Sequence, residues 1–376
     1  MIISSLRTAS FRNLADAVIP TSAKNIFFVG ENGQGKSNFL EALYYCAYAS
    51  SFRGARDSEI VQDGKKDFSA KITLAERPLA GDMGSEVLVR LEKGKKNISV
   101  DGKKAEDRKE LLSVVPCIVF CHEDMEFVAG SPERRRWFFD QAISLSDPVY
   151  LDDLRRYRWI LKSRNNVLRE MSAGREAQKD PRQSNALLDT FDLQFVIHGL
   201  RLMEMRERAA RLFSEIFAPL YEEVFKGEAA GMTVQYTPSW KSSSEDEAYA
   251  HILSRRAADI AAGVSLSGPH RDRYSFVLGG KDFTGIASTG QRRLLALLLR
   301  VAQARRYNEA SGRNPILLLD DVLLEMDGEK RRRFLSVLPG YDQAFYTFLP
   351  DEPYQRYRGE DTMVYHVREG RAEAEA

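Results

Sequence analysis

The chain has 376 residues, of which 43% are hydrophobic and 29% charged, and its formal net charge is +1 at pH 7. This length allows two or three domains, and this composition excludes an intrinsically disordered chain. The near-neutral charge also excludes a simple polycation, so any binding of nucleic acid must depend on a local basic patch.

Targeting and membrane signals are not found in the sequence. Residues 1–7 lack the apolar run and the small-residue cleavage site of a signal peptide. No apolar run reaches the roughly 18 residues of a membrane span. We therefore expect a cytoplasmic protein that has no membrane partner.

The cysteines indicate a reducing compartment, because their number is low and odd: Cys46, Cys117 and Cys121. Cys117, Cys121 and His122 lie close together in the sequence, so they fit either a metal site or a buried strand. A fourth ligand at a suitable spacing is missing, which favours the buried strand.

The first third of the chain predicts a strand, a glycine-rich turn and a helix, followed by several further strands. Alternating apolar residues are the signal for the later strands. The predicted elements are a strand at 25–29, a turn at 30–35, a helix at 37–48, antiparallel strands within 68–100, a turn at 101–102 and a strand at 116–120.

The middle of the chain, from about residue 148 to 225, has a helical pattern. Its large apolar residues recur at spacings of three, four and seven: Tyr150, Leu154, Tyr157, Leu161 and Leu168. A polar break at 172–185 separates a first helix from a longer one at 187–225, with a possible break near Pro219. This pattern predicts a helical hairpin or small bundle, followed by a linker at 239–247.

Alternation of strands and helices returns after residue 262. We expect a helix at 292–307, an entirely apolar strand at 316–319 and a frayed tail at 371–376.

The string from Gly30 to Ser37, GENGQGKS, matches the phosphate-binding pattern G-x-x-x-x-G-K-[ST]. Glycines let backbone N–H groups curve around a phosphate, and the start of a helix adds partial positive charge. Lys36 is predicted to reach the β- and γ-phosphates, and Ser37 to coordinate Mg²⁺. A chance glycine-rich turn is the alternative, but the strand before the loop and the helix after it favour a nucleotide site.

A second candidate feature is the pair Asp320 and Asp321, which follows the apolar strand at 316–319. A strand that is buried on both faces is continuously apolar, and ligands bind at the carboxyl ends of such strands. Asp320 is therefore placed to hold Mg²⁺, and Asp321 to orient or deprotonate the attacking water. The alternative is an ordinary acidic turn after a core strand.

A third feature opens the helix that precedes this strand. Ser288, Gly290 and Gln291 at a helix N-terminus can bind an anion, although a plain N-cap explains them equally well. Together with the acidic strand, they resemble the signature motif of ABC-type ATPases. In that family the signature completes the ATP site of a second subunit, so the resemblance implies a homodimer with ATP between its subunits.

The phosphate loop and the acidic strand lie in opposite halves of the chain, so a segment is inserted between them. This plan is similar to that of SMC-like and Rad50-like heads, with a much shorter helical hairpin. The predicted fold is an α/β ABC-ATPase head with an inserted helical subdomain. The predicted domains are 1–145 for the N-terminal part of the head, 146–235 for the helical arm and 236–376 for the C-terminal part of the head.

Further strings, in order along nearly the whole chain, resemble the RecF family. They are residues 11–14 (FRNL), 40–42 (LEA), 51–53 (SFR), 123–124 (ED), 130–140 (GSPERRRWFFD), 267–272 (SGPHRD), 288–292 (STGQR) and 319–321 (LDD) with Asp327. The resemblance implies a slow, DNA-stimulated ATPase with ATP and Mg²⁺ as cofactors. It also implies an ATP-dependent homodimer that binds DNA, either duplex or single-strand/duplex junctions, and helps load RecA at gaps together with RecO-type and RecR-type mediators.

The resemblance also implies site residues. The catalytic residues are Lys36, Asp320 and Asp321, and the Mg²⁺ residues are Ser37 and Asp320. The nucleotide-binding residues are Arg12, Asn13, Gly30, Asn32, Gly33, Gly35, Lys36, Ser37, Asn38, Ser288, Gly290 and Gln291. Asp327 matches the loop that contacts the second subunit, and Arg53 is expected either to touch phosphate or to be a surface or ion-paired arginine.

The sequence departs from the family pattern at several positions. Asp321 stands where many ABC ATPases have Glu, and this shorter side chain suggests slow hydrolysis. His122 stands where the family usually has Pro, so the position of Glu123 is in doubt. Thr347 stands where many ABC ATPases have a switch His, which removes one sensor of the γ-phosphate.

The candidate DNA-binding residues gather around the start of the helical arm: Arg135, Arg136, Arg155, Arg156, Arg158 and Lys162. They can follow the phosphates of DNA without reading its sequence. Acidic residues interleave with them, so an ordinary solvated face is the alternative, and Arg135 and Arg136 can instead be structural.

Three other functions fit parts of the pattern. A Rad50-like partner of a nuclease needs a long coiled coil and a metal-hook cysteine motif, which are missing here. A transporter-associated ATPase subunit does not need the helical insertion or the FRNL string. A phosphotransferase with a phosphate loop does not need the signature motif.

Overall fold

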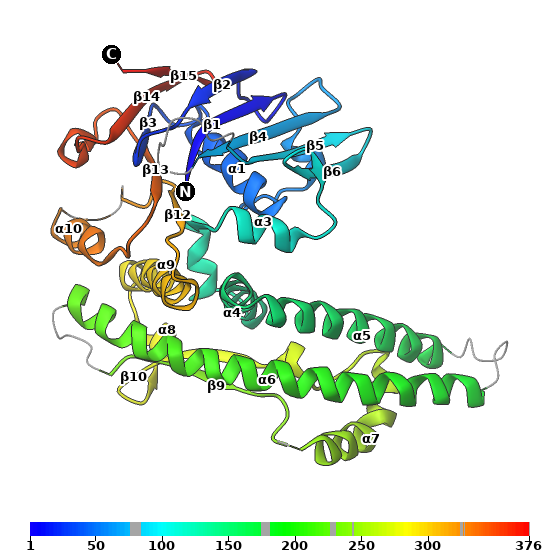
Figure 1. Cartoon of the computed structure of the whole chain (residues 1–376). Helices are drawn as coiled ribbons and strands as arrows, with labels where there is room; N and C mark the ends of the chain where they lie inside the picture. The colour runs from blue at the N-terminus through cyan, green and yellow to red at the C-terminus, as the bar shows by residue number, and fades with distance from the viewer. Residues whose placement is uncertain are drawn as a thin grey trace. The chain divides into compact units, whose positions relative to one another are not determined.

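The computed structural model describes residues 1–75, 84–173, 181–225, 231–242, 244–323, 326 and 328–375. The chain forms two compact units, which we call the head unit and the arm unit. The head unit comprises Met1–Asp124 and Ala304–Ala376, and the arm unit comprises Met125–Gln303. The predicted domain boundaries, after residues 145 and 235, both lie inside the arm unit. Figure 1 shows that the N-terminal segments (blue to cyan) and the C-terminal segments (orange to red) build the head unit together.

The head unit contains a largely parallel sheet of six strands in the order β15-β14-β3-β13-β12-β8. The five strands from β14 to β8 are parallel, and β15 runs antiparallel to β14. Its strands are β3 (Asn25–Val29), β8 (Cys117–Phe120), β12 (Ile316–Leu319), β13 (Gln343–Phe348), β14 (Thr362–Arg368) and β15 (Arg371–Ala374). All residues of β12 are buried, as the continuous apolar run predicts for a strand covered on both faces.

A second sheet of six strands, in the order β2-β1-β4-β5-β6-β7, is antiparallel throughout. Its strands are β1 (Ile2–Ala9), β2 (Ala17–Pro20), β4 (Phe68–Ala75), β5 (Glu86–Glu92), β6 (Lys95–Val100) and β7 (Lys103–Lys104). The alternating burial along β4 and β5 leaves one face apolar. Helix α1 (Lys36–Tyr48) shares one hydrophobic core with both sheets, and Phe39 stacks on Phe28 of β3 at 4.9 Å between ring centroids.

The rest of the head unit consists of short elements and one longer helix. They are α2 (Asp57–Ile60), α3 (Arg108–Val114), α10 (Gly328–Val337), the 3-10 turn η4 (Tyr354–Tyr357) and the beginning of the 3-10 turn η1 (His122–Phe127).

The predicted frayed tail is wrong for residues 371–374, which form β15. Glu369 and Gly370 have φ values of 47° and 74°, so the chain reverses tightly after β14. β15 then pairs with β14 from Arg371 to Ala374. Backbone hydrogen bonds along this hairpin order the end of the chain.

In the arm unit, α5 (Pro148–Ser172) and α6 (Pro181–Phe225) form the predicted helical hairpin. Pro148 occupies the first helical position of α5, and the Asp147 carboxylate accepts hydrogen bonds from the backbone of Val149 (2.9 Å) and Tyr150 (3.2 Å). The other elements are α4 (Pro132–Ser146), β9 (Thr233–Thr237), α7 (Glu245–Ala262), η3 (Pro269–Arg271), β10 (Arg273–Leu278), β11 (Lys281–Asp282), α8 (Phe283–Ile286) and most of α9 (Thr289–Ser311).

Two details of the predicted helical region are corrected. Helix α6 continues through Pro219. Burial of the neighbouring Phe217, Leu220 and Tyr221 offsets the roughly 3 kcal/mol that an internal proline costs. The predicted linker at 239–247 contains the start of α7, because the Ser244 hydroxyl accepts a hydrogen bond from the Glu247 backbone at 3.3 Å.

The three cysteines are free and buried. Cys117 lies on β8 and Cys121 directly after it, and burial raises the pKa of the Cys46 thiol. Among the described residues, no group of three or more His, Cys, Asp or Glu side chains is arranged to hold a metal ion. In the same part of the chain, no helix has the length and apolarity needed to cross a membrane.

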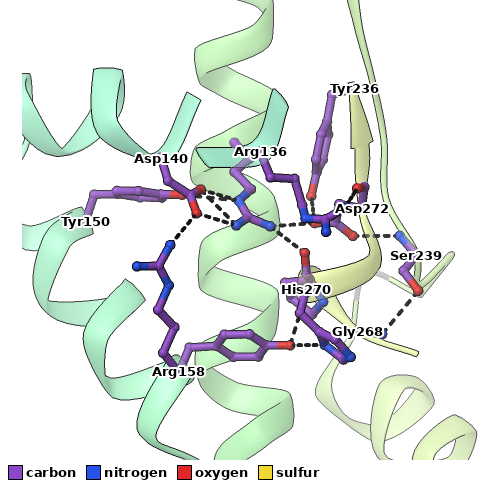
Figure 2. A network of polar contacts seen from close by, with 12 residues as sticks. Arg136, Asp140, Tyr150, Arg158, Tyr236, Ser239, Gly268, His270 and Asp272 are labelled. Carbon is purple, nitrogen blue, oxygen red and sulfur yellow. Dashed lines mark hydrogen bonds and ion pairs between the residues drawn. The ribbon is translucent and has the colours of Figure 1, made fainter. Parts of the chain in front are cut away.

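A buried polar network stabilises the arm unit, and Figure 2 shows the part of it around Asp140 and Asp272. The central residue of the network is Arg206 of α6. Its guanidinium binds both carboxylate oxygens of Asp140 (2.8 and 3.1 Å), the Pro269 carbonyl (2.7 Å) and the Asp272 carboxylate (3.0 Å). Burial alone would lower the pKa of Arg206, but Asp140, Tyr150 and Asp272 raise it well above its ordinary value. Arg206 is therefore a permanent cation that joins α4, α6 and η3.

The same network holds the turn at residues 268–272. The Asp272 carbonyl accepts a hydrogen bond from Arg136 at 2.7 Å (Figure 2). The hydroxyl of Tyr157 lies 2.9 Å from Nδ1 of His270. Burial lowers the pKa of His270 to about 4, so its imidazole is neutral at physiological pH.

We predict that Arg206→Met destabilises the protein by about 3–5 kcal/mol, because it removes the buried cation that Asp140 and Asp272 share. Urea unfolding measures this change. Arg211→Ala on the same helix is the control, because Arg211 pairs with Glu207 at 3.4 Å in an exposed position and should contribute less than about 0.5 kcal/mol. Equal effects of the two substitutions would contradict the role given to the network.

Candidate nucleotide-binding site

The glycine-rich loop joins β3 to α1, and two of its glycines are required by the backbone. Gly35 has a φ of 107°, a conformation that side chains rarely adopt. A Cβ atom on Gly30 would lie 2.4 Å from the carbonyl oxygen of Val367. The loop therefore has its shape because glycines stand at these two positions.

Neighbouring segments hold the loop in place. The Gln34 carbonyl accepts a hydrogen bond from the Gly370 backbone at 2.8 Å, and its side-chain oxygen accepts one from the Glu369 backbone at 2.7 Å. Asn13 donates its side-chain amide to the Gly33 carbonyl at 3.3 Å and accepts a hydrogen bond from Asn38 at 2.8 Å. These contacts order the loop without a ligand.

The Lys36 ammonium lies inside the loop and is buried. It donates hydrogen bonds to the carbonyls of Gly30 (2.7 Å) and Glu31 (3.1 Å). An ammonium has three donors, so one remains for a phosphate oxygen. Asn32 and Gly33, by contrast, are exposed.

The first turn of α1 meets the end of β12, where the hydroxyl of Ser37 hydrogen-bonds to the carboxylate of Asp320. Burial, together with the charges of Asp321 and Glu123, raises the pKa of Asp320 to about 6, although Ser37 and Arg53 act in the opposite direction. The phosphate loop and the paired aspartates are thus brought together. The charge of Glu123 acts at this site although His122 replaces the proline usual in the family.

Thr347 of β13 positions Asp321. The Thr347 hydroxyl accepts a hydrogen bond from the Asp321 backbone and contacts the Asp321 carboxylate, both at 2.8 Å. Asp321 has a φ of 52°, which is uncommon for a residue with a side chain. From the sequence, Thr347 was notable only because it replaces the switch histidine of many ABC ATPases. In the structure its hydroxyl contacts both aspartates, including Asp320 at 3.3 Å.

Glu41 organises the arginines of the site, a role that its place in the string at 40–42 (LEA) does not reveal. Its fully buried carboxylate accepts hydrogen bonds from Arg12 at 2.9 and 3.0 Å and one from the Ser51 hydroxyl. Arg53 lies 3.7 Å from Glu41 and 3.7 Å from Asp320, and donates to Asn38 at 3.0 Å. Arg53 is therefore ion-paired, and its contact with phosphate stays a prediction. A glutamate within the apolar string that follows the phosphate loop was the available signal.

The chemistry of Ser37 and Asp320 suits Mg²⁺. A hydroxyl and a carboxylate are oxygen ligands, and protein sites for Mg²⁺ usually supply only one or two of them, leaving the others to phosphate and water. Burial, and to a smaller extent the charges of Asp321 and Glu123, raise the pKa of Asp320 because they disfavour its ionised form. A divalent cation beside this carboxylate would favour the ionised form.

The predicted signature residues begin α9 in the arm unit and are accessible. Ser288 and Gln291 cap the helix reciprocally: the Ser288 backbone donates to the Gln291 side chain at 2.8 Å, and the Gln291 backbone donates to the Ser288 hydroxyl at 3.3 Å. Ser288 and Gly290 are exposed, and no atom lies within 4 Å of a Cβ built on Gly290. Asp327, the predicted dimer-contact residue, lies outside the described residues.

The candidate DNA-binding residues fall into two groups. Arg135 donates to the carbonyls of Val128 (2.8 Å) and Tyr274 (3.2 Å), and Arg136 donates to the Asp272 carbonyl, so both hold the interior of the arm unit. Burial lowers the pKa of both arginines. The second group lies on α5, where Arg156, Arg158 and Lys162 are exposed and Arg155 is half-buried. Arg158 also pairs with Asp140 at 3.2 Å.

Comparisons with known proteins agree with this architecture. Residues 2–364 match the family model described as the RecF/RecN/SMC N terminal domain. A DNA replication and repair protein RecF from Treponema pallidum (strain Nichols) is 43% identical over 96% of this chain and 98% of its own length. A RecF protein from Shouchella clausii (strain KSM-K16) is 31% identical over 92% of each chain.

The chain is also similar in structure to solved proteins of this kind. A structure of the recombination mediator protein RecF with ATP, in the RecFOR pathway, is 25% identical and has a TM-score of 0.87, covering 100% of this chain and 97% of that one. An Smc head domain from Pyrococcus furiosus, 15% identical with a TM-score of 0.53 over 99% of this chain and 95% of that one, shares the fold.

We predict that Mg²⁺ binding in the presence of ATP weakens as the pH falls below about 6, because a proton then competes for Asp320. The apparent affinity should fall by roughly tenfold per pH unit below that value. Titration calorimetry between about pH 5 and 7.5 measures it, a range that covers the raised pKa. Asp321→Asn should move the midpoint to lower pH by removing a neighbouring negative charge, and a flat profile in both proteins would refute the prediction.

Proposed function

The chain belongs to the RecF/RecN/SMC family, and from its RecF relatives we propose that it is an ATP-gated, DNA-binding ATPase of replication and recombinational repair. The observation that carries the proposal is the contact of Ser37 with Asp320, which unites the phosphate loop with the acidic strand end. We propose ATP and Mg²⁺ as cofactors and the cytoplasm as the location.

In this proposal the residues of the nucleotide site in the head unit have distinct roles. The backbone of the loop and Lys36 bind the phosphates. Ser37 and Asp320 would hold Mg²⁺, which supplies positive charge beside the β- and γ-phosphates. Asp321 orients the attacking water or accepts its proton, and Thr347 fixes the Asp321 carboxylate. The short Asp321 side chain makes hydrolysis slow.

We propose that two copies of the chain enclose two ATP molecules. The start of α9 around Gly290 is exposed, and Ser288 and Gln291 cap it reciprocally. A helix N-terminus presents backbone N–H groups and partial positive charge, which favour an anion. In the dimer, this helix start of one copy would bind the γ-phosphate that is held by Lys36 of the other. ATP binding thereby drives association, and hydrolysis releases it.

DNA is the proposed macromolecular partner, bound along the exposed cations of α5. The RecFOR pathway of the structural relative supports RecO-type and RecR-type proteins as further partners, with RecA loading at gaps as the outcome. A Rad50-like role beside a nuclease is not favoured, because α5 has 25 residues and extends only about 38 Å. The segment 148–225 also contains no cysteine for a metal hook.

We predict that a slowly hydrolysed ATP analogue converts the protein from monomer to dimer, which light scattering measures directly. Lys36→Met should abolish the conversion, because it removes the charge that binds the phosphates. Asp321→Asn should keep the dimer in the presence of ATP itself, because it slows hydrolysis and spares binding. A wild-type protein that stays monomeric with the analogue would defeat the proposed dimer.

We predict that the double substitution Arg155→Glu and Arg156→Glu weakens duplex DNA binding. It should also lower the slope of log affinity against log salt concentration by about 1 for each phosphate contact that is lost. Fluorescence anisotropy at several salt concentrations measures both quantities. The matched control is Arg211→Glu on α6, another exposed cation of the arm unit. An unchanged affinity and slope in the double variant would remove α5 from the DNA surface.

A further inference from the structure

The outer face of α5 carries an exposed tryptophan between its cations. Trp159 is 62% exposed, whereas Trp240 is 1% exposed and Trp137 is 38% exposed. Tryptophan is on average one of the more buried residue types, and the fold gains little from an indole that stays in water. Trp159 is therefore the most exposed of the three tryptophans, and its ring is accessible to a ligand.

Helical spacing places cations on both sides of this indole. Arg155 and Arg156 lie four and three residues before Trp159, and Lys162 lies three residues after it, so all of them share its face of the helix. Within the part of the chain that the structure describes, no carboxylate pairs with Arg156 or Lys162. From the first arginines to Lys162 the helix rises about 10 Å, which leaves room for a sugar–phosphate backbone on either side of one base.

The ring is also supported from behind. Phe191 of α6 contacts Trp159 edge to face, with 6.1 Å between ring centroids and an interplanar angle of 69°. Such a contact restricts the rotation of the indole and leaves part of its surface in solvent. Acidic residues on this face of α5 lie further away, with Asp152 about two turns before Trp159 and Glu170 about three turns after it.

We propose that Trp159 is a stacking platform for an unpaired DNA base, and that α5 therefore binds DNA where single-stranded nucleotides are available. The inference rests on the proposed DNA-binding function and adds its specificity-determining residue. Aromatic rings flanked by cations are the usual means of binding single strands without sequence preference. Within a continuous duplex both faces of each base are covered by neighbouring bases, so only unpaired nucleotides can use the ring.

The experiment compares three DNA probes with the full chain and a slowly hydrolysed ATP analogue: a covalently closed circular duplex, the same circle with a single-stranded gap, and an oligothymidine. Trp159→Ala should weaken binding of the gapped circle and the oligothymidine by about 5- to 150-fold and leave binding of the closed circle unchanged. Trp159→Phe should restore part of the loss, because it keeps an aromatic ring. Leu193→Ala, at a 47% exposed leucine of α6, should change none of the affinities.

Intrinsic fluorescence gives a second measurement. Oligothymidine should quench the emission of the wild-type protein, and Trp159→Phe should remove most of the quenching although Trp137 and Trp240 remain. Quenching that persists in Trp159→Phe would overturn the proposal.

Two other outcomes of the binding experiment would overturn it. If Trp159→Ala weakens all three probes equally, the residue supports the arm unit and does not recognise unpaired bases. If it changes none of them, the exposed ring belongs to a protein contact. Arg156→Glu is measured in parallel to distinguish failure of the stacking role from failure of the proposed function. A wild-type protein that binds none of the probes refutes DNA binding itself. If Arg156→Glu weakens binding and Trp159→Ala leaves it unchanged, only the stacking role is refuted.

Discussion

The contact between Ser37 and Asp320 is the constraint on which the head unit depends. Parallel strands end at the same edge of a sheet, so the residues that follow β3, β12 and β13 meet there. β13 lies between β3 and β12 in the strand order. It therefore supplies Thr347 at the same edge, where its hydroxyl reaches the carboxylate that follows β12. Segments from both ends of the chain thus build one site.

The buried carboxylates at this edge of the sheet differ in how their charge is compensated. Glu41 is buried and aligns Arg12, and it lies within ion-pair distance of Arg53, so these arginines keep fixed positions before any ligand arrives. Asp320, by contrast, is buried close to the charges of Asp321 and Glu123, and its carboxylate therefore keeps a raised pKa. Ordered cations beside under-compensated carboxylates suit a ligand that brings both phosphates and a metal ion.

The arm unit divides its cations in a different way. Arg206, Arg135 and Arg136 bind carbonyls or carboxylates inside the unit, where they fix helices and turns to one another. Arg156 and Lys162 lie on the outer face of α5 beside Trp159. The interior cations belong to α4 and α6, whereas the outer ones belong to α5. Arginines that look alike in the sequence thus differ in position: some have partners inside the unit and others are exposed.

The sequence by itself determined the elements whose signals are local. The phosphate loop, the helical hairpin and the apolar strand before Asp320 all follow from spacing, glycine positions or continuous hydrophobicity, and the match of the chain to the RecF pattern confirmed the family. The local signals gave a wrong prediction at the C-terminal tail. Residues 371–374 were expected to be frayed, but they pair with β14 and are ordered. Only the tertiary structure gave Glu41 and Thr347 their roles and separated Arg135 and Arg136 from the exposed cations of α5. These assignments depend on which side chains meet across strands and helices far apart in the chain, and no spacing along the sequence encodes that.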